Sequence, residues 1–463
     1  MKLLLCISLI IIPFLSFSQW SKTYGGIGFE TGFSLQQTAD GGYIMTGMTD
    51  SFGNGGGDIW LLKLDSAGDT IWTKTIGGTI TEEGLTVRQT NDGGFIITSR
   101  KGSIPYNTQL IKTNNVGDTL WTRTFGGTES DILIGLEETN DYGFILSGRT
   151  QSFGDINGLA DIWLIRTNST GDTLWTKTYG GLNWDQGKSI QTNDGGFLIS
   201  SVTHSFINSG QGWLLKTDNL GDTLWTKLYG GFWDEYLAQT IQTSDNGYAT
   251  IGSTNSYGNG NNDVWMIKTD ISGDTLWTKT FGGSDNDYGS GIDQTSDGGY
   301  VISAGTSSSG NGLVDVWLIK TNSSGDTLWT RTYGGSSNDY PGECYQTTDG
   351  GYVIMGYTES FGSGDHDLWL IKTDANGYAE TKEIFLSKKL EVYPNPTSET
   401  VFIDGLGAIS GVSFIEIISS SGERMNVVLD WSEEINVSNL SSGVYFINVH
   451  HENGVETMKL VKK

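Results

Sequence analysis

Short apolar segments of about seven residues alternate with polar, glycine-rich segments along most of the chain. One unit begins with the alternating segment 20–24, which ends in Gly25-Gly26, and continues with a second predicted strand at 34–38. Asp40-Gly41-Gly42 then predicts a tight hairpin turn, because Asp-Gly and Gly-Gly supply the positive φ angles that such turns need. Residues 43–49 follow as a third predicted strand.

The fourth predicted strand, 58–64, is apolar on both faces, and the turn 65–69 leads into the next unit. The unit therefore contains four short strands, and none of it has helical periodicity. A strand that is apolar on both faces must be covered on both sides. Blades stacked around an axis provide that cover, and a two-layer sandwich does not.

The unit recurs seven times. Its tryptophan returns at intervals of 49 to 54 residues, as Trp20, Trp72, Trp121, Trp175, Trp225, Trp277 and Trp329. Each copy ends in a glycine pair, namely Gly25-Gly26, Gly77-Gly78, Gly126-Gly127, Gly180-Gly181, Gly230-Gly231, Gly282-Gly283 and Gly334-Gly335. A strand-rich repeat of this length is typical of a propeller or solenoid. The sequence predicts an all-β chain with a seven-bladed β-propeller over residues 19–387, including an exit linker.

The ends of the repeat series predict how the ring closes. The Trp20 segment keeps both the tryptophan and the glycine pair, whereas the last candidate outer strand, 377–384, lacks both. We therefore expect the N-terminal strand to complete the last blade and residues 377–387 to form the exit linker. The alternative is that 378–384 forms the outer strand.

The repeats stop near residue 387, and residues 388–463 consist of short strands separated by Ser-Gly turns. This pattern predicts a small, Ig-like β-sandwich domain. The stretch also resembles the type A C-terminal sorting domain of the type IX secretion system of Gram-negative bacteria. The resemblance lies in Tyr393-Pro394-Asn395-Pro396, Leu440-Ser441-Ser442-Gly443-Val444-Tyr445 and Lys459-Leu460-Val461-Lys462.

The resemblance implies export through the periplasm and across the outer membrane, and then removal of the domain. It also implies that the protein is secreted or attached to the outer-membrane surface, with the type IX secretion machinery as a partner. The sorting-signal residues that it implies are Asn395, Pro396, Gly443, Tyr445, Lys459, Leu460, Val461 and Lys462.

The N-terminus agrees with export. Lys2 is followed by an apolar run of about 13 residues and by Ser16-Phe17-Ser18, which predicts a signal peptide over residues 1–18. No later segment is long and apolar enough to predict a transmembrane helix. Removing residues 1–18 leaves one cysteine, Cys344, and therefore no intrachain disulfide.

Charge narrows the classes of partner. The chain has 53 acidic and 27 basic side chains, which argues against nucleic acid as a partner because phosphate binding needs basic patches.

The turn Asp218-Asn219-Leu220-Gly221-Asp222 followed by Trp225 resembles the tryptophan-docking blades of quinoprotein-type propellers, although its Asp-to-Gly spacing is one residue shorter. That resemblance implies that an Asp, a Gly and a Trp tie neighbouring blades together, and it implies no cofactor.

An acidic residue lies four positions beyond each glycine pair: Glu30, Glu82, Asp131, Asp185, Glu235, Asp287 and Asp339. Two interpretations compete for this set. The carboxylates could ring the axial opening and hold Ca²⁺, which prefers several oxygen ligands. Alternatively, each could cap backbone N–H groups in the loop of its own blade, which suits a feature repeated in every blade.

Aromatic residues accompany the acids, and they are the candidate ligand-binding residues: Trp184, Trp233, Tyr236, Tyr288 and Tyr340. Trp184 and Trp233, in adjacent units, break the symmetry of the repeat. Stacking on sugar rings is one role for them, and packing is another.

The sequence contains no nucleophile elbow, zinc-protease motif or phosphate loop, so we predict no catalytic residue. The expected function is a secreted or cell-surface binding module for extracellular glycan or protein. The alternative is a propeller-fold polysaccharide hydrolase or lyase.

Overall fold

A computed structural model describes residues 19–102, 104–154, 159–206, 209–379, 391–404, 412–419, 424–428, 434–451 and 454–463. The predicted signal peptide, 1–18, lies outside these ranges, and so does the predicted domain boundary between 387 and 388. The chain divides into two compact units, Met1–Glu380 and Thr381–Lys463. The described parts of both units consist of strands and loops, and no helix in these parts is long and apolar enough to cross a membrane.

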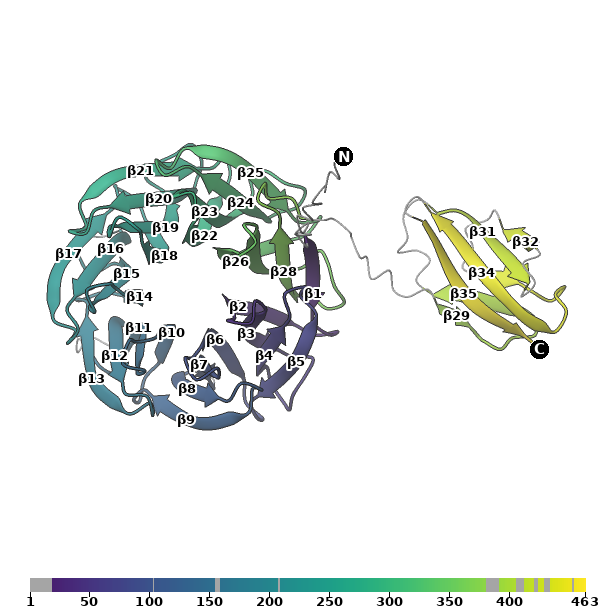
Figure 1. The fold of residues 1–463 in the computed structure, drawn as a ribbon, viewed down its shortest axis with the longest axis horizontal. Coiled ribbons are helices and arrows are strands. Elements are labelled where there is room, and N and C mark those ends of the chain that lie inside the picture. Colours follow the sequence, from purple (N-terminus) through teal and green to yellow (C-terminus); the bar gives the residue numbers. More distant parts are fainter. Residues whose placement is uncertain are drawn as a thin grey trace, which may run out of the picture. The chain divides into compact units, whose positions relative to one another are not determined.

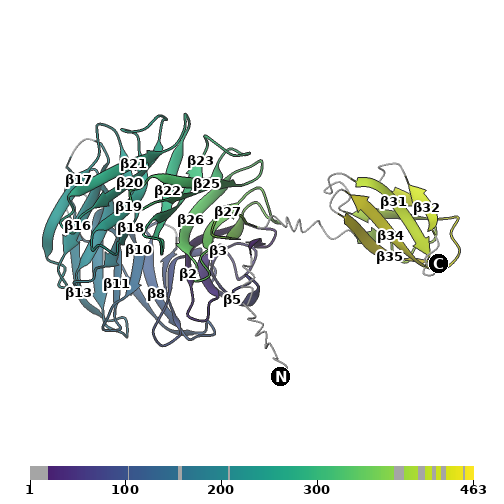
Figure 2. The same cartoon turned by 45° about the horizontal axis from the view of Figure 1, so that its top comes forward.

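The first unit contains seven four-stranded antiparallel sheets arranged in a ring around a central opening (Figure 1, Figure 2). Each sheet has one innermost strand beside the opening and one outermost strand. We number them sheet 1 to sheet 7, from the sheet that contains β2.

The strands of the first four sheets follow the chain in order. Sheet 1 contains β2 (Glu30–Gln37), β3 (Tyr43–Thr49), β4 (Asp58–Leu64) and β5 (Thr70–Ile76), and sheet 2 contains β6 (Glu82–Gln89), β7 (Phe95–Lys101), β8 (Asn107–Thr113) and β9 (Thr119–Phe125). Sheet 3 contains β10 (Asp131–Glu138), β11 (Phe144–Thr150), β12 (Asp161–Thr167) and β13 (Thr173–Tyr179), and sheet 4 contains β14 (Asp185–Gln191), β15 (Phe197–Thr203), β16 (Gln211–Thr217) and β17 (Thr223–Tyr229).

The remaining sheets complete the ring. Sheet 5 contains β18 (Glu235–Gln242), β19 (Tyr248–Thr254), β20 (Asp263–Thr269) and β21 (Thr275–Phe281), and sheet 6 contains β22 (Asp287–Gln294), β23 (Tyr300–Thr306), β24 (Asp315–Thr321) and β25 (Thr327–Tyr333). Sheet 7 contains β26 (Asp339–Gln346), β27 (Tyr352–Thr358), β28 (Asp367–Thr373) and β1 (Trp20–Tyr24).

The first strand of the chain closes the ring, as the sequence predicts. Strand β1 pairs antiparallel with β28, with Trp20 opposite Lys372 and Tyr24 opposite Leu368. Within the described part of the alternative segment, Ala379 forms only an isolated bridge to Thr373. The N-terminal and C-terminal ends of the repeat series therefore share one sheet.

The third strand of each sheet is buried because neighbouring sheets cover both of its faces. All seven residues of β4 are buried. Ile59 and Leu61 of β4 share a hydrophobic core with Phe95 and Ile97 of sheet 2, whereas Trp60 and Leu62 share one with Leu368 of sheet 7. One strand thus contributes to two interfaces, which explains why its sequence is apolar at successive positions.

Each tryptophan of an outermost strand packs on a glycine of the next sheet. Trp225 lies so close to Gly273 that a Cβ on this glycine would be 2.7 Å from the indole ring, and the φ of Gly273 is +77°. Lys227 pairs with Asp274 at 2.7 Å, and the Tyr229 hydroxyl donates to the Gly273 carbonyl at 2.6 Å. These contacts give the Asp, Gly and Trp landmarks the blade-tying role that the resemblance to tryptophan-docking propellers implies.

The Asp-Gly-Gly turns are fixed by a buried cation. Lys63 is 5% exposed, and its Nζ lies 2.9 Å from Asp40 Oδ2 and donates to the Leu64 carbonyl. The same pair recurs in the other sheets as Lys112–Asp92, Arg166–Asp141, Lys216–Asp194, Lys268–Asp245, Lys320–Asp297 and Lys372–Asp349. The aspartate therefore does more than shape a turn, because it also satisfies a buried lysine or arginine.

The second unit contains two sheets around one core. One sheet has the order β29 (Glu391–Tyr393), β30 (Thr400–Asp404), β33 (Glu434–Asn436), and the other has the order β32 (Arg424–Val428), β31 (Val412–Ser419), β34 (Gly443–His451), β35 (Gly454–Lys462). Val401 and Ile435 of the first sheet share a hydrophobic core with Ile417, Ile447 and Leu460 of the second. Two packed sheets agree with the predicted two-layer organisation of this domain.

Candidate functional site

The glycine pairs lie at crowded junctions between sheets. A Cβ on Gly282 would lie 2.0 Å from Asp263 Oδ1, and one on Gly283 would lie 2.6 Å from the Ser308 Cβ. The first glycine of each pair faces a polar residue that begins the third strand of the same sheet, at positions Asp58, Asn107, Asp161, Gln211, Asp263, Asp315 and Asp367. Side chains at these junctions would displace their neighbours, which explains why the pair recurs.

The seven predicted acids begin the innermost strands rather than lying in free loops. All are buried, with at most 3% exposure: Glu30, Glu82, Asp131, Asp185, Glu235, Asp287 and Asp339. Glu30 accepts hydrogen bonds from Gly26 N–H at 2.9 Å, from the Thr49 hydroxyl at 2.8 Å and from Ser51 N–H at 3.0 Å. Each acid also donates its backbone N–H to a carbonyl of the preceding sheet, as Glu30 does to His366 at 3.0 Å.

This geometry favours loop capping over metal binding. Asp287 accepts from Gly283 N–H at 2.8 Å and from the Ser308 hydroxyl at 2.7 Å, and Asp339 makes the equivalent contacts with Gly335 and Ser360. Each carboxylate thus serves its own loop. Within the described ranges, no three His, Cys, Asp or Glu side chains form a group that could hold a metal ion.

The five predicted aromatic residues differ in their availability. Trp184 is partly buried: its ring packs against His204 at 6.1 Å, and the Arg149 guanidinium lies 5.4 Å from the ring centroid. Tyr288 is partly buried, and desolvation raises the pKa of its hydroxyl. Tyr340 is stacked on Tyr357, with ring centroids 4.7 Å apart. These three rings already have protein neighbours.

The other two aromatic residues are exposed. Trp233 is 60% exposed and Tyr236 is 45% exposed, and Phe232, at 80%, packs edge-on against Trp233 with centroids 5.1 Å apart. Two loop residues of sheet 4 are also exposed: Leu182, before β14, at 65%, and Phe206, after β15, at 50%. These five side chains, here called the apolar rim, are all close to the end of the sheets at which the glycine-pair loops lie.

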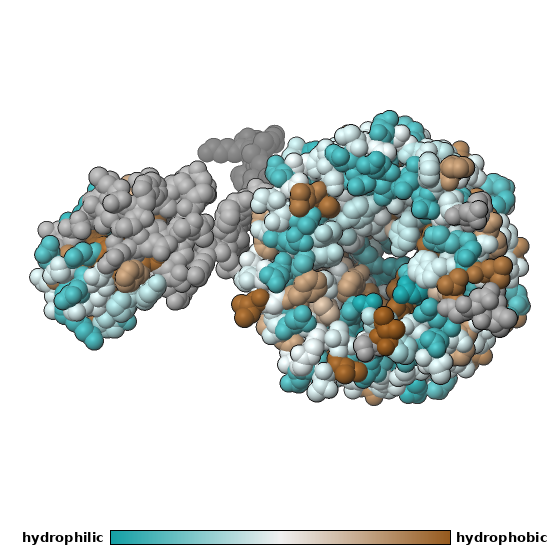
Figure 3. Space-filling view, turned by 180° about the vertical axis from the view of Figure 1, so that it is seen from behind, coloured by the Kyte–Doolittle hydropathy of each residue, from teal (hydrophilic) through white to brown (hydrophobic). Residues whose placement is uncertain are grey.

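Other parts of the ring surface carry hydrophobic residues too. Figure 3 shows hydrophobic side chains in several separate groups on one face of the ring, with hydrophilic side chains between them. What distinguishes the apolar rim is the pair of adjacent, exposed aromatic residues Phe232 and Trp233, with Tyr236 three positions further on. Exposed apolar clusters of this kind often mark binding surfaces.

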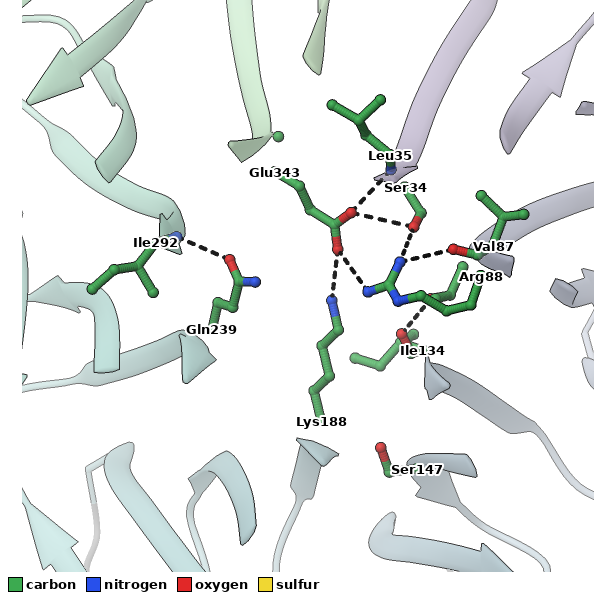
Figure 4. A network of polar contacts seen from close by, with 12 residues as sticks. Ser34, Leu35, Val87, Arg88, Ile134, Ser147, Lys188, Gln239, Ile292 and Glu343 are labelled. Atoms are coloured by element: carbon green, nitrogen blue, oxygen red, sulfur yellow. Dashed lines mark hydrogen bonds and ion pairs between the residues drawn. The ribbon is translucent and has the colours of Figure 1, made fainter. Parts of the chain in front are cut away.

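A second polar cluster, which the sequence did not predict, lies in the central channel (Figure 4). Lys188 of β14 reaches across the channel and places Nζ 3.2 Å from Glu343 Oε1 of β26. Arg88 of β6 approaches the same carboxylate at 3.4 Å. The other oxygen of Glu343 accepts from Leu35 N–H at 2.9 Å and from the Ser34 hydroxyl at 3.2 Å.

This carboxylate is strongly stabilised in its charged form. Burial raises the pKa of Glu343, but the positive charges of Lys188 and Arg88 and the Leu35 N–H outweigh burial and lower the pKa well below its ordinary value. A buried charge is tolerated only when an opposite charge and hydrogen bonds offset its loss of hydration. The cluster therefore joins sheets 1, 2, 4 and 7 through the channel.

A cavity of about 400 Å³ lies beside this cluster, and all seven innermost strands contribute to its lining. Its lining includes two carboxyl groups with raised pKa, Glu137 of sheet 3 and Asp293 of sheet 6. Burial raises the pKa of both, although Gln191 N–H donates to Glu137 at 2.7 Å and Gln346 N–H donates to Asp293 at 2.9 Å. Carboxyl groups perturbed by burial in a cavity are typical of ligand-binding and catalytic sites.

One feature of the sequence could have predicted this channel site, namely a position in the innermost strands that differs among the sheets. Each innermost strand is followed directly by a threonine, and the residue four positions before that threonine varies among the sheets: Ser34, Thr86, Gly135, Lys188, Gln239, Gly291 and Glu343. Only two of these side chains are charged, and they have opposite signs. The position that varies among the sheets therefore lines the channel, whereas the position that is always acidic bonds to the loops.

The sorting-signal residues in the second unit lie together. Asn395 donates its side-chain N–H to the Lys459 carbonyl at 2.7 Å and accepts from Val461 N–H at 2.9 Å. The neighbouring Thr397 pairs in the same way with Val461 and Lys463 through backbone bonds. Tyr445 is buried, and its hydroxyl donates to the Ser441 carbonyl at 2.8 Å. The Pro-Asn-Pro segment is therefore bound to the C-terminal strand.

Comparison with known proteins identifies the tail. Residues 391–463 match the family described as the secretion system C-terminal sorting domain. The match confirms the predicted sorting domain, and it indicates export by the type IX secretion system to the cell surface or the extracellular space. It also implies contact with the secretion machinery. No curated protein is similar in sequence to this chain.

Several solved structures are similar to the chain at low identity. A protein of unknown function from Dyadobacter fermentans DSM 18053 is 14% identical, with a TM-score of 0.41, over 62% of this chain and 93% of its own. Sqt1 from Chaetomium thermophilum is 12% identical, with a TM-score of 0.43, over 73% and 82%. The Pan2 WD40 domain of Neurospora crassa is 10% identical, with a TM-score of 0.44, over 77% and 96%.

Proposed function

We propose that this chain is a binding module that acts outside the cell, built on a seven-bladed β-propeller that carries its ligand site at the apolar rim. The observation that carries this proposal is the exposure of Phe232, Trp233 and Tyr236 at one junction between sheets. The positions equivalent to Phe232 in the other sheets hold no aromatic residue, so Phe232 is a local departure from the repeat: Ile27, Thr79, Thr128, Leu182, Ser284 and Ser336. A ligand that contacts the sheets unequally would select such a departure.

The propeller assignment rests on the contacts between sheets. Seven sheets recur with the same strand order, tryptophans pack on glycines of the next sheet, and β1 completes sheet 7. Such radial repetition leaves only short, protected sheet edges, as in propellers. We assign residues 19–387 to this domain and its exit linker.

The ligand we favour is an extracellular glycan. Exposed Trp and Tyr rings offer flat apolar faces with polar edges, which suit the faces of sugar rings. Tyr236 and Trp233 would stack on the sugar, and Trp184 of the neighbouring sheet would support the surface from a partly buried position. Tyr288 and Tyr340 belong to sheets 6 and 7, outside the rim. The seven buried acids act as loop caps in this proposal.

A pair of variants tests the site. Polysaccharide binding by the purified full chain would be compared with that of Trp233→Ala and of Leu276→Ala, a 58% exposed residue on an outermost strand away from the rim. We expect Trp233→Ala to lower affinity about tenfold or more, because stacking of a sugar ring on an aromatic ring contributes on the order of 1 kcal/mol or more. Leu276→Ala should bind as the native chain does. Equal affinity of all three proteins would contradict the proposed site.

Export follows from the tail, and we propose its details. A signal peptide at 1–18 would direct the chain to the periplasm, and an Ig-like sandwich at 388–463 would present Asn395, Pro396, Gly443, Tyr445 and the segment 459–462 to the secretion machinery. The bonds from Asn395 to Lys459 and Val461 hold two of these motifs side by side. Deletion of residues 459–463 should leave the protein in the periplasm, and normal surface display of the deletion variant would refute this signal.

A polysaccharide hydrolase or lyase is the second candidate. The observation that favours it is the pair of partly buried carboxyl groups, Glu137 and Asp293, that line one cavity with raised pKa. A carboxyl group whose pKa is raised by burial could act as a general acid beside a second carboxylate. Release of oligosaccharide products, lost in both Glu137→Gln and Asp293→Asn, would support this candidate over the binding module.

A further inference from the structure

The channel cavity lies at the opposite end of the sheets from the apolar rim. Its lining comes mostly from the second halves of the innermost strands, and it includes Gln37 and Gln346, the last residues of β2 and β26. The glycine-pair loops enter the same strands at their first residues, such as Glu30. The cavity is thus a separate site, and an inference about it does not depend on the rim.

The fixed charges around the cavity leave one carboxylate without a counter-charge. Glu343 is paired with Lys188 and Arg88, and Glu137 also experiences the field of these two cations. These four groups, two cations and two carboxylates, balance. Asp293 lies in sheet 6, and in the described part of the chain backbone N–H groups are its donors and no cation pairs with it.

Such a carboxylate is costly to bury without a cation. Burial raises the pKa of Asp293 even though one oxygen accepts from Gln346 N–H. A partly buried carboxylate regains stability when a positive group enters its cavity and replaces the lost water. The cavity wall near Asp293 therefore selects a ligand that carries a positive charge.

The rest of the wall suits a hydroxylated ring. Gln239 uses its carbonyl oxygen to accept from Ile292 N–H at 2.9 Å, which leaves its amide N–H groups for other partners. Lys188 Nζ and Tyr345 also line the cavity, while Ile190 and Ile241 add an apolar wall from sheets 4 and 5. Polar groups on one side and an apolar wall on the other match a pyranose ring, and a cavity of about 400 Å³ has room for one or two such rings.

We infer that this cavity binds an amino sugar, with the ammonium group of the ligand against Asp293, its hydroxyl groups on Gln239 and Lys188, and the apolar face of its ring on Ile190 and Ile241. The ion pair of Lys188 with Glu343 stays in place and forms one end of the site. The site is thus specific for a small, hydroxylated ligand that carries a positive charge, and it is distinct from the polysaccharide surface at the rim.

Three sugars with the same ring test this inference by titration calorimetry on the purified full chain at pH 7. Glucosamine carries the ammonium group, N-acetylglucosamine replaces it with a neutral amide, and glucose with a hydroxyl. We expect glucosamine to bind at least tenfold more tightly than the other two. Equal affinities for all three, or no binding of glucosamine at millimolar concentration, would overturn the inference.

Two variants locate the site. Asp293→Asn keeps an acceptor for Gln346 N–H but removes the charge, and we expect it to lower glucosamine affinity at least tenfold and abolish the preference for glucosamine. Trp233→Ala at the rim should leave glucosamine affinity unchanged even if it loses polysaccharide binding. The experiment therefore tests the channel site independently of the rim site. Unchanged glucosamine affinity in Asp293→Asn would contradict the placement. If this variant does not fold, as judged by near-ultraviolet circular dichroism, the sugar series on the native chain still decides.

Discussion

Lys188 and Glu343 form an ion pair of 3.2 Å across the central channel, although 155 residues separate them in the sequence. The pair joins sheet 4 to sheet 7, which also holds the N-terminal strand. Glu343 in addition accepts the Leu35 N–H of sheet 1. One side chain thus connects the two sheets at which the ring closes with a sheet on the other side of the channel.

Removal of the cation should destabilise the ring. Lys188→Met leaves the buried Glu343 carboxylate with Arg88 as its main counter-charge, and we expect the free energy of unfolding to fall by about 1–3 kcal/mol. The matched control is Lys177→Met, which removes an exposed pair with Asp222 at 2.8 Å and should cost less than about 1 kcal/mol. Urea unfolding followed by tryptophan fluorescence measures both. A smaller loss in Lys188→Met than in the control would contradict the role given to the channel pair.

Tryptophan docking can be separated from backbone strain by two glycine variants. Gly273 and Gly298 have similar φ angles, +77° and +80°, so alanine costs each about 1–2 kcal/mol in backbone strain. A Cβ on Gly273 would meet the Trp225 ring at 2.7 Å, whereas one on Gly298 would meet nothing within 4 Å. We expect Gly273→Ala to lose at least 1 kcal/mol more unfolding free energy than Gly298→Ala. Equal losses would show that docking contributes nothing beyond the turn conformation.

The strand pattern could be read from the sequence, but the start of the innermost strand could not. The sequence predicts 43–49 and 58–64 as the structure has them, because those strands are apolar and end at glycine-rich turns. The second strand was expected to begin at residue 34, yet β2 begins at Glu30. A β-bulge between Gly32 and Ser34 breaks the alternation there, and the buried Glu30 has the polarity of a loop residue.

The channel cluster was missed for a different reason. Lys188 and Glu343 are brought together only by closure of the ring, and nothing local in either strand relates them. The acids after the glycine pairs, in contrast, are evident in the sequence because they recur in every unit. Their carboxylates bond mainly to the loops that flank them and their N–H groups bond to the preceding sheet, so the recurring residues belong to the scaffold and the varying ones line the channel.

Acid should weaken the turn ion pairs in a defined window of pH. Burial raises the pKa of Asp40, Asp92 and Asp297, but hydrogen bonds from a threonine and a lysine outweigh it and lower each pKa to about 2. An unfolded aspartate has a pKa of about 3.9. Because the folded pKa is the lower one, the stabilisation is complete above about pH 4 and is lost as pH falls towards about 2.

Urea midpoints measured at pH 5, 3 and 2 check this expectation. The native chain should lose stability steeply over this interval, and Lys320→Met, which removes the cation beside Asp297, should lose less over the same interval. A midpoint that stays constant from pH 5 to pH 2 would contradict the contribution of the turn pairs.

Chelation distinguishes the two roles considered for the seven acids. If they cap loops, EGTA should leave the melting temperature unchanged within about 1 °C, because no metal contributes to stability. Asp287→Ala should still lower the free energy of unfolding by about 1–2 kcal/mol, since the Gly283 N–H and the Ser308 hydroxyl lose their acceptor. A lower melting temperature in EGTA that added Ca²⁺ restores would instead establish the metal role.

The binding function is tested most directly by a glycan array probed with the purified full chain, with product analysis on every glycan that is retained. The account predicts that a restricted set of glycans binds, that binding is lost in Trp233→Ala, and that the glycans are recovered intact. Shortened or unsaturated products would contradict the binding module and favour a hydrolase or lyase. Absence of any retained glycan would contradict glycan recognition at the rim.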